Sequence, residues 1–291
     1  MTASEGPDFI CVGMPRAGTG WLYDQLRHHS DFWLPPVKEL DYLTHSKPSL
    51  ASVQRAYDRI RPKRLRENVH VRGPKWDDRN FAFLDEAVTL AKRERDIARY
   101  AVLFRHKGAL KSGDITPRYG LLAPEVIAEI AAKLPHLKVI YLIRDPVARV
   151  WSHINLIYDR NEFDHALLED SGAFARFVDN HPALLTSSRA TRTLESWKGA
   201  APSLPFRHFL FDDIAREPER TRREILEFLN ADPGKPSAHL PPGYNRKAGR
   251  TPLAMPVAIR DVLRDRLAGE VRACASLLGG SARDWPALYG L

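Results

Sequence analysis

A glycine-rich octapeptide, residues 13–20, joins a short apolar run to the start of a helical pattern. The run, residues 9–12, is typical of a buried strand, and Trp21, Leu22 and Leu26 recur at helical spacing after the octapeptide. A strand that turns directly into a helix leaves the first N–H groups of the helix without backbone partners, beside the positive end of the helix dipole. Small residues let a ligand approach these groups closely. The segment therefore predicts an anion-binding loop in an α/β fold.

The spacing of Gly13 and Gly18 copies that of the phosphate loop of P-loop proteins, but Thr19 stands where that loop has its lysine. A cation appears inside the loop instead, as Arg16. The missing lysine argues against an Mg-ATP phosphotransferase, which uses it together with a serine or threonine that binds Mg²⁺. For this segment alone, phosphate binding and a purely structural glycine turn both stay open.

The clearest buried strand in the sequence, residues 137–143, ends at Arg144, and a helix that carries Ser152 follows. A guanidinium at the end of a buried strand is held in place. Together with a hydroxyl group it forms a suitable receptor for a dianionic phosphate monoester. The alternative is an ordinary turn, in which Asp145 caps Arg144 and Arg149 is an exposed residue of the helix.

Strands and helices alternate along the rest of the chain. Further strands are predicted at 32–34 and 206–211, helices at 124–134, 218–230 and 256–278, and a basic, mostly helical region at 44–112. This alternation is typical of βαβ units, so we predict an α/β fold: a P-loop-like three-layer α/β/α arrangement with a central parallel sheet. Ligands of such sheets bind beyond the carboxyl ends of the strands, where both motifs lie.

The chain has 291 residues, 44% of them hydrophobic, and no linker-like stretch divides it, so we expect a single domain over residues 1–291. The formal net charge of +8 favours anionic partners such as nucleotides, acidic glycans, nucleic acid or an acidic membrane surface. Without a membrane-length apolar run or a secretory signal pattern, we expect a cytoplasmic protein. Two cysteines suit a reducing compartment, and without Cys/His groups at metal-site spacing we expect no metal.

Four segments, in the same order, resemble the PAPS-dependent sulfotransferase superfamily, whose donor is 3′-phosphoadenosine 5′-phosphosulfate. They are residues 15–22 (PRAGTGWL), 36–43 (PVKELDYL), 113–119 (GDITPRY) and 144–152 (RDPVARVWS), with weaker matches at 194–197, 225–229 and 244–250. The second and third are similar to the bacterial and Golgi-type glycan sulfotransferases, the heparan-sulfate-like branch. The resemblance implies an enzyme that moves a sulfuryl group to a hydroxyl or amine of a carbohydrate or small metabolite.

The resemblance also implies which residues bind the donor. Residues 16–21 would cradle the 5′-phosphosulfate, Arg144 and Ser152 would bind the 3′-phosphate, and the loop of residues 246–250 would close over the nucleotide. The full set expected to bind the donor is Pro15, Arg16, Ala17, Gly18, Thr19, Gly20, Trp21, Arg144, Ser152, Arg246, Lys247, Gly249 and Arg250.

In-line sulfuryl transfer needs a cation near the leaving oxygen and a base for the proton of the acceptor. Arg16 is the candidate cation, at a position where many family members have lysine. Glu39 is the candidate base, because the glycan branch has its base at this position; the alternative is a surface turn. If this segment is extended, Glu39 and Asp41 face one side and Lys38 the other. Weaker candidates for contact with the acceptor are Asp41, Asp114 and His153.

Two other functions stay open. A P-loop kinase would require Mg²⁺ and ATP, against the missing lysine of the loop. A non-catalytic module for nucleic acid or acidic glycans would explain the net charge and a basic segment made of Arg59, Arg61, Lys63, Arg64 and Arg66. No nucleic-acid-binding signature accompanies that segment, so we expect no specific nucleic acid partner. The same segment also suits the wall of an acceptor cleft.

Overall fold

The computed structural model describes residues 6–64, 77–235, 240–244 and 252–291. Its described strands form a four-stranded parallel sheet in the order β2-β1-β3-β4. The strands are β1 (Phe9–Cys11), β2 (Gly113–Ile115), β3 (Lys138–Ile143) and β4 (Phe206–Leu210). Phe9 of β1 is in register with Gly113 on one side and with Lys138 on the other. The predicted α/β fold with a central parallel sheet is confirmed.

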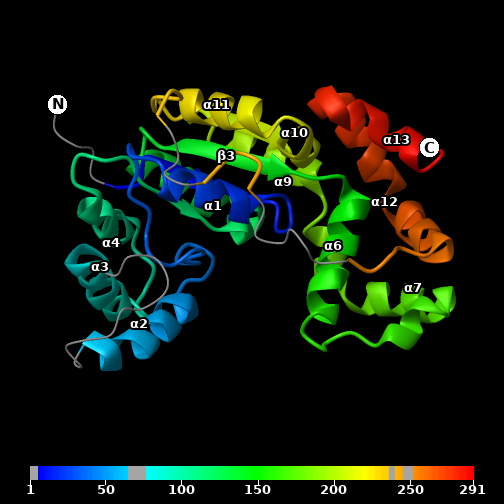
Figure 1. Ribbon diagram of the computed structural model, residues 1–291, viewed down its shortest axis with the longest axis horizontal. Helices are drawn as coiled ribbons and strands as arrows, with labels where there is room; N and C mark the ends of the chain where they lie inside the picture. The colour runs from blue at the N-terminus through cyan, green and yellow to red at the C-terminus, as the bar shows by residue number, and fades with distance from the viewer. Residues whose placement is uncertain (1–5, 65–76, 236–239, 245–251) are drawn as a thin grey trace.

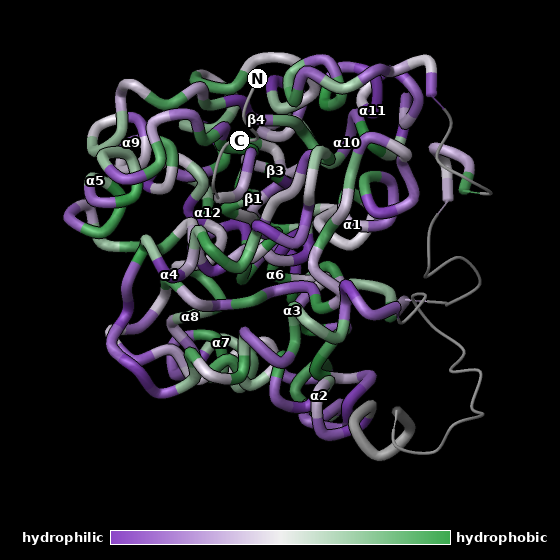
Figure 2. Tube along the Cα trace, turned by 90° about the vertical axis from the view of Figure 1, so that its left-hand side faces the viewer, coloured by the Kyte–Doolittle hydropathy of each residue, from purple (hydrophilic) through white to green (hydrophobic). Residues whose placement is uncertain are grey.

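Helices cover both faces of the sheet (Figure 1). The α-helices of the described residues are α1 (Thr19–Arg27), α2 (Ala51–Arg64), α3 (Asp78–Thr89), α4 (Ile97–Val102), α5 (Pro124–Lys133), α6 (Pro146–Tyr158), α7 (Ser171–Asn180), α8 (Pro182–Thr186), α9 (Ala190–Ala200), α10 (Phe211–Arg216), α11 (Pro218–Phe228), α12 (Val257–Leu278) and α13 (Trp285–Leu288). Figure 2 shows β1, β3 and β4 between α5 and α9 on the left and α1, α10 and α11 on the right. In this described part, the helices are too short or too polar to cross a membrane.

Strand β3 forms where the sequence pattern is strongest. Its residues 139–143 are apolar and almost completely buried, as the middle of a parallel sheet covered on both faces requires. Asp145 then starts α6, because its carboxylate accepts hydrogen bonds from the N–H groups of Val147 and Ala148. Pro146 suits the first helical position, where its missing N–H leaves no bond unmade. The second motif is therefore a tight strand-to-helix junction.

Two short elements differ from the sequence predictions. Residues 32–34 do not form a strand; Phe32 makes an isolated bridge to Lys111, and the three side chains are apolar because they are buried. Strand β2 is not visible in the sequence pattern because it has only three residues, one of them charged. Gly113 is required there, since a Cβ at this position would lie 2.4 Å from the ring of Phe9.

The C-terminal helices support the loops that follow β3 and β4. The hydroxyl of Tyr289 donates a hydrogen bond to Asp145, the residue that starts α6. The indole N–H of Trp285 donates to Asp212 of α10 at 2.6 Å. Residues from the end of the chain thus hold two of the turns at the carboxyl edge of the sheet.

Candidate nucleotide-binding site

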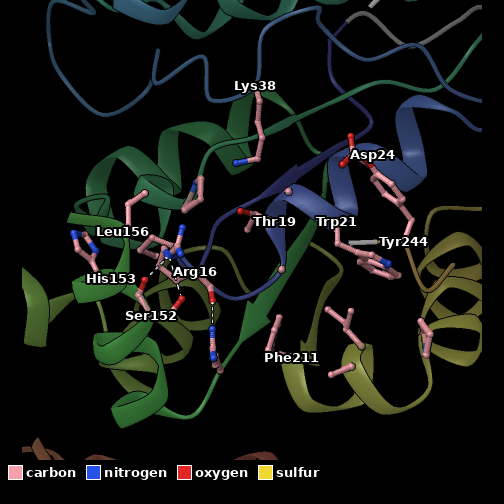
Figure 3. Close-up of a pocket in the computed structure, with 18 of the residues that line it drawn as sticks. Arg16, Thr19, Trp21, Asp24, Lys38, Ser152, His153, Leu156, Phe211 and Tyr244 are labelled. Atoms are coloured by element: carbon pink, nitrogen blue, oxygen red, sulfur yellow. Dashed lines mark hydrogen bonds between the residues drawn. The ribbon is translucent and has the colours of Figure 1, made fainter. Parts of the chain in front are cut away.

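A cavity of about 710 Å³ opens at the carboxyl edge of the sheet (Figure 3). Segments that follow all four strands line it: the 15–21 segment after β1, Pro117 after β2, Arg144 after β3 and Phe211 after β4. A parallel α/β sheet binds its ligands at this edge. The cavity is therefore the candidate site.

Most of the residues predicted from the sequence line this cavity. They are Pro15, Arg16, Gly18, Thr19, Gly20, Trp21, Glu39, Arg144, Ser152 and His153. Ala17 is fully buried within the same loop. Asp41 and Asp114 are not among the residues that line the cavity. Arg246, Lys247, Gly249 and Arg250 lie outside the described residues, as does Arg66, so their roles stay predictions.

The glycine-rich loop is tied to the second motif through Arg16. The Nε of Arg16 donates to the backbone oxygen of Ser152 at 3.0 Å and to its hydroxyl oxygen at 3.2 Å. In return, Arg144 donates a hydrogen bond at 3.1 Å to the backbone oxygen of Arg16. The two segments, more than 120 residues apart in sequence, therefore form one receptor.

Arg144 is held by packing as well as by this hydrogen bond. Its guanidinium lies over the ring of Phe211, 4.4 Å from the centroid. Burial lowers its pKa, while the nearby carboxylates of Asp145 and Asp212 act in the opposite direction. Asp145 accepts its hydrogen bonds from the start of α6 and from Tyr289. Asp145 thus caps the start of α6 and does not cap Arg144.

One face of α6 carries a group of polar side chains toward the glycine-rich loop. Ser152, His153 and Leu156 of this helix line the cavity, as does Arg160 just after its end. Arg149, one turn before Ser152 and His153, is completely buried, so its interpretation as an exposed helical residue is wrong. The helical spacing of three and four residues to Ser152 and His153 was the available signal for this placement.

Arg149 is a buried cation with few partners. Its Nη2 donates to the backbone oxygen of Leu184 at 2.7 Å, while Nε and Nη1 have no hydrogen-bond partner among the described residues. Burial, together with the charges of Arg16 and Arg144, lowers the pKa of Arg149 to about 9. The guanidinium groups of Arg16, Arg144 and Arg149 therefore lie near one another at the glycine-rich loop. This arrangement favours an anionic ligand.

His153 is neutral at physiological pH. Burial, followed by the positive charges of Arg149, Arg16 and Arg160, lowers its pKa to about 4. Its Nδ1 is buried and has no hydrogen-bond partner within the described part of the chain. A neutral imidazole keeps one N–H group and one nitrogen lone pair, so His153 can donate or accept one hydrogen bond.

The segment that carries Glu39 does not have the predicted extended conformation. Glu39 and Asp41 are both left-handed, with φ of 64° and 56°. For residues other than glycine this conformation costs roughly 1–2 kcal/mol each. Lys38, expected to point away, lines the cavity together with Glu39 and forms an ion pair with it. The side chain of Glu39 is 50% exposed.

The two other predicted carboxylates have different surroundings. Asp41 pairs with Arg118 at 2.8 Å and accepts a hydrogen bond from the hydroxyl of Thr44. Asp114 is buried in β2, where it accepts hydrogen bonds from hydroxyl groups. Burial raises the pKa of Asp114 to about 6, although the hydrogen bonds it accepts lower it. Neither carboxylate lines the cavity, so their contact with an acceptor stays a prediction.

The other side of the cavity is aromatic and was only partly predicted. Trp21 donates through its indole N–H to the backbone oxygen of Pro242 at 2.6 Å, which holds the segment with Tyr244 beside α1. Figure 3 shows Tyr244 close to Trp21, on the far side of Thr19 from His153. Phe211, which follows β4 directly, was missed although its position at a strand end was a usable signal. Within the described ranges, no group of three or more His, Cys, Asp or Glu side chains is arranged to hold a metal ion.

Comparisons with known proteins bear on the family and the fold of the chain. The profile of the sulfotransferase family matches residues 7–233. A sulfotransferase structure from Alicyclobacillus acidocaldarius superposes with a TM-score of 0.65 at 18% identity and covers 97% of this chain and 99% of its own. The sulfotransferase domain of the olefin synthase from Synechococcus PCC 7002 is 16% identical, with a TM-score of 0.47 over 90% of this chain and 95% of its own. A search of curated proteins finds no match.

The first of these structures supports the fold, and the family profile covers most of the chain, including both strand-end motifs. The chain is thus a member of the sulfotransferase family.

Proposed function

We propose that this sulfotransferase uses 3′-phosphoadenosine 5′-phosphosulfate as its donor and sulfates a hydroxyl or amine of a carbohydrate or small metabolite. Family membership supplies the sulfuryl transfer, and the donor, the acceptor and the residue roles are the proposed part. The supporting observation is the contact between the two motifs, in which Arg16 is bonded to Ser152 and Arg144 is bonded to Arg16.

The residues around the cavity fit a nucleotide with phosphates at two positions. The N–H groups at the start of α1 and Arg16 suit the 5′-phosphosulfate. Arg144 and Ser152 suit the 3′-phosphate, because a guanidinium and a hydroxyl supply several donors to one dianion. Trp21 and Phe211 offer aromatic faces for a base. When bound, the nucleotide supplies the sulfuryl group on its 5′-phosphate.

The transfer itself needs two further groups from the chain. Arg16 would stabilise the negative charge that develops on the leaving oxygen of the 5′-phosphate. Glu39 accepts the proton that the acceptor hydroxyl loses, as its position at the rim of the cavity allows. The polar side formed by Lys38, His153 and Arg160 suits a polar acceptor better than a hydrophobic one. A carbohydrate or a small polar metabolite fits that description.

Two measurements test the proposal. Adenosine 3′,5′-bisphosphate without metal should raise the thermal unfolding midpoint, whereas ATP with Mg²⁺ should not. The reverse result would favour a kinase, and salt-dependent nucleic-acid binding with no effect of either nucleotide would favour a non-catalytic module. Incubation with labelled donor and a panel of acceptors, with the products identified by mass spectrometry, then gives the acceptor class.

A further inference from the structure

The loop that carries Glu39 has no secondary structure of its own. Residues 33–50 contain neither helix nor strand, and within this stretch Glu39, Asp41 and Leu50 have left-handed backbones. Such residues persist only where the surroundings hold them. The shape of the Glu39 loop must therefore come from neighbouring elements.

Three consecutive backbone N–H groups of this loop, those of residues 41–43, donate hydrogen bonds to the hydroxyl groups of Thr116 and Tyr119. Asp41 donates to the hydroxyl of Thr116 at 3.4 Å, and Tyr42 and Leu43 donate to the hydroxyl of Tyr119 at 3.0 and 3.4 Å. In place of a strand partner, the loop thus has a row of buried side-chain oxygens.

Asp114 sets the direction of these hydrogen bonds. The hydroxyls of Thr116 and Tyr119 each donate to Asp114, both at 2.7 Å. A hydroxyl has a single proton, so once that proton points to a carboxylate its oxygen can only accept from the loop. The carboxylate therefore orients two hydroxyl groups as acceptors for the loop amides.

We infer that Asp114 is a positioning residue for Glu39: acting through Thr116 and Tyr119, it holds the backbone of residues 41–43 so that Glu39 stays at the cavity. The inference rests on the proposed role of Glu39 as the base. It gives a function to Asp114, whose carboxylate does not line the cavity.

A matched pair of tyrosines separates this role from a general contribution to stability. Tyr119 and Tyr100 are both completely buried, and both donate a hydrogen bond to the same oxygen of Asp114, at 2.7 and 3.1 Å. Only the hydroxyl of Tyr119 also accepts from the loop; Tyr100 packs its ring against Tyr42. Tyr119→Phe and Tyr100→Phe should therefore both lower the unfolding midpoint, but they should differ at the site.

For Tyr119→Phe we expect a fall in kcat of roughly 10- to 100-fold, since a small misplacement of a catalytic group has effects of this size. The Kd for adenosine 3′,5′-bisphosphate should stay within about twofold of the wild-type value, because the nucleotide side is untouched. Hydrogen exchange of a peptide covering residues 40–43 should accelerate. Tyr100→Phe should change kcat and this exchange far less. Equal effects of the two substitutions on kcat and exchange would overturn the inference.

Two substitutions of Thr116 test the inference if Tyr119→Phe fails to fold. Thr116→Val removes the hydroxyl that accepts from Asp41, and Thr116→Ser keeps it. We expect Thr116→Val to lower kcat and Thr116→Ser to restore most of it. If the two variants have the same kcat, the hydroxyl does not act as inferred.

The double variant with Glu39→Gln distinguishes failure of the inference from failure of the proposed function. If Tyr119→Phe acts through Glu39, it should lower kcat no further once Glu39 is replaced. Normal turnover of Glu39→Gln alone would refute the proposed base. Impaired Glu39→Gln combined with normal Tyr119→Phe would refute only the positioning role, as would additive losses in the double variant.

Discussion

Arg16 and Ser152 are joined by two hydrogen bonds, from Nε of the arginine to the backbone oxygen and to the hydroxyl of the serine, at 3.0 and 3.2 Å. Arg16 belongs to the loop after β1, and Ser152 lies on the helix after β3. A phosphate that binds the hydroxyl of Ser152 would therefore lie close to the guanidinium of Arg16. Substitutions in either motif are expected to act on the same ligand.

Replacing Arg144 tests the phosphate receptor. Hydrogen bonds to charged groups contribute about 1.5–3 kcal/mol, so Arg144→Ala should weaken binding of adenosine 3′,5′-bisphosphate by roughly 10- to 100-fold. Calorimetric titration measures this affinity, and thermal unfolding checks that the fold is kept. Arg160→Ala, which removes a cation just after α6 in the same cavity, should have a smaller effect. If Arg144→Ala binds adenosine 3′,5′-bisphosphate with unchanged affinity, Arg144 does not bind the 3′-phosphate.

Replacing Glu39 tests the base. Glu39→Gln should bind the nucleotide normally and lose roughly 100-fold or more in kcat, a loss typical of a missing general base. Asp41→Asn is the matched comparison, because Asp41 is in the same loop and has the same left-handed backbone but turns toward Arg118. Its kcat should fall much less. Near-normal turnover of Glu39→Gln would assign the proton transfer to another group.

The pKa of His153 reports on the buried arginine. After burial, the charge of Arg149 is the largest cause of the lowered value of about 4, ahead of Arg16 and Arg160. Arg149→Met should therefore raise the pKa of His153, as followed by NMR titration of its imidazole signal. Arg160→Met should raise it less. If the order of the two variants is reversed, the assumed arrangement of charges is incorrect.

The same lowered pKa makes stability depend on pH. An unfolded histidine has a pKa near 6.5, so on acidification the unfolded state binds a proton at His153 before the folded state does. The contribution of His153 to stability is complete above about pH 6.5 and is lost as the pH falls toward 4. In thermal unfolding at a series of pH values, His153→Asn should lose less stability over this range than the wild type. Parallel curves for the two proteins would contradict the expectation.

Two glycines of the loop should respond in opposite ways to alanine. Gly18 has φ of 93°, and a Cβ there would lie 3.1 Å from Ile214, so Gly18→Ala should destabilise by at least about 1–2 kcal/mol. Gly20 lies within α1, where a Cβ meets nothing within 4 Å, so Gly20→Ala should be neutral or stabilise by up to about 1 kcal/mol. Chemical denaturation measures both free energies of unfolding. The opposite order would mean that the turn before α1 is not as described.

The sheet and the two strand-end motifs could be predicted because their signals are local. The apolar run of β3, the proline at the start of α6 and the glycine turn before α1 each constrain the backbone directly. Strand β2 lacks such a signal: Gly113 is there to make room for Phe9 of the neighbouring strand, a contact between residues distant in sequence. Residues 32–34 have the composition of a strand because their side chains are buried, not because they pair along a ladder.

The arrangement around Glu39 could not be predicted for a related reason. A left-handed glutamate is unfavourable by itself, and the residues that follow it, Asp41 and Tyr42, donate hydrogen bonds to Thr116 and Tyr119, more than 70 residues away in sequence. Alternation of side chains along an extended segment was the wrong rule for such a loop. The burial of Arg149 likewise follows from the packing of α6 against its neighbours, which the helical pattern indicates only in part.

The contacts of Tyr289 with Asp145 and of Trp285 with Asp212 make the support of the candidate site depend on residues that do not line its cavity. A truncation before residue 285 would remove the donors to two carboxylates that flank Arg144 and Phe211. Residues 285–291 would then have a structural role at the site, and the first effect of removing them would be a lower affinity for the nucleotide.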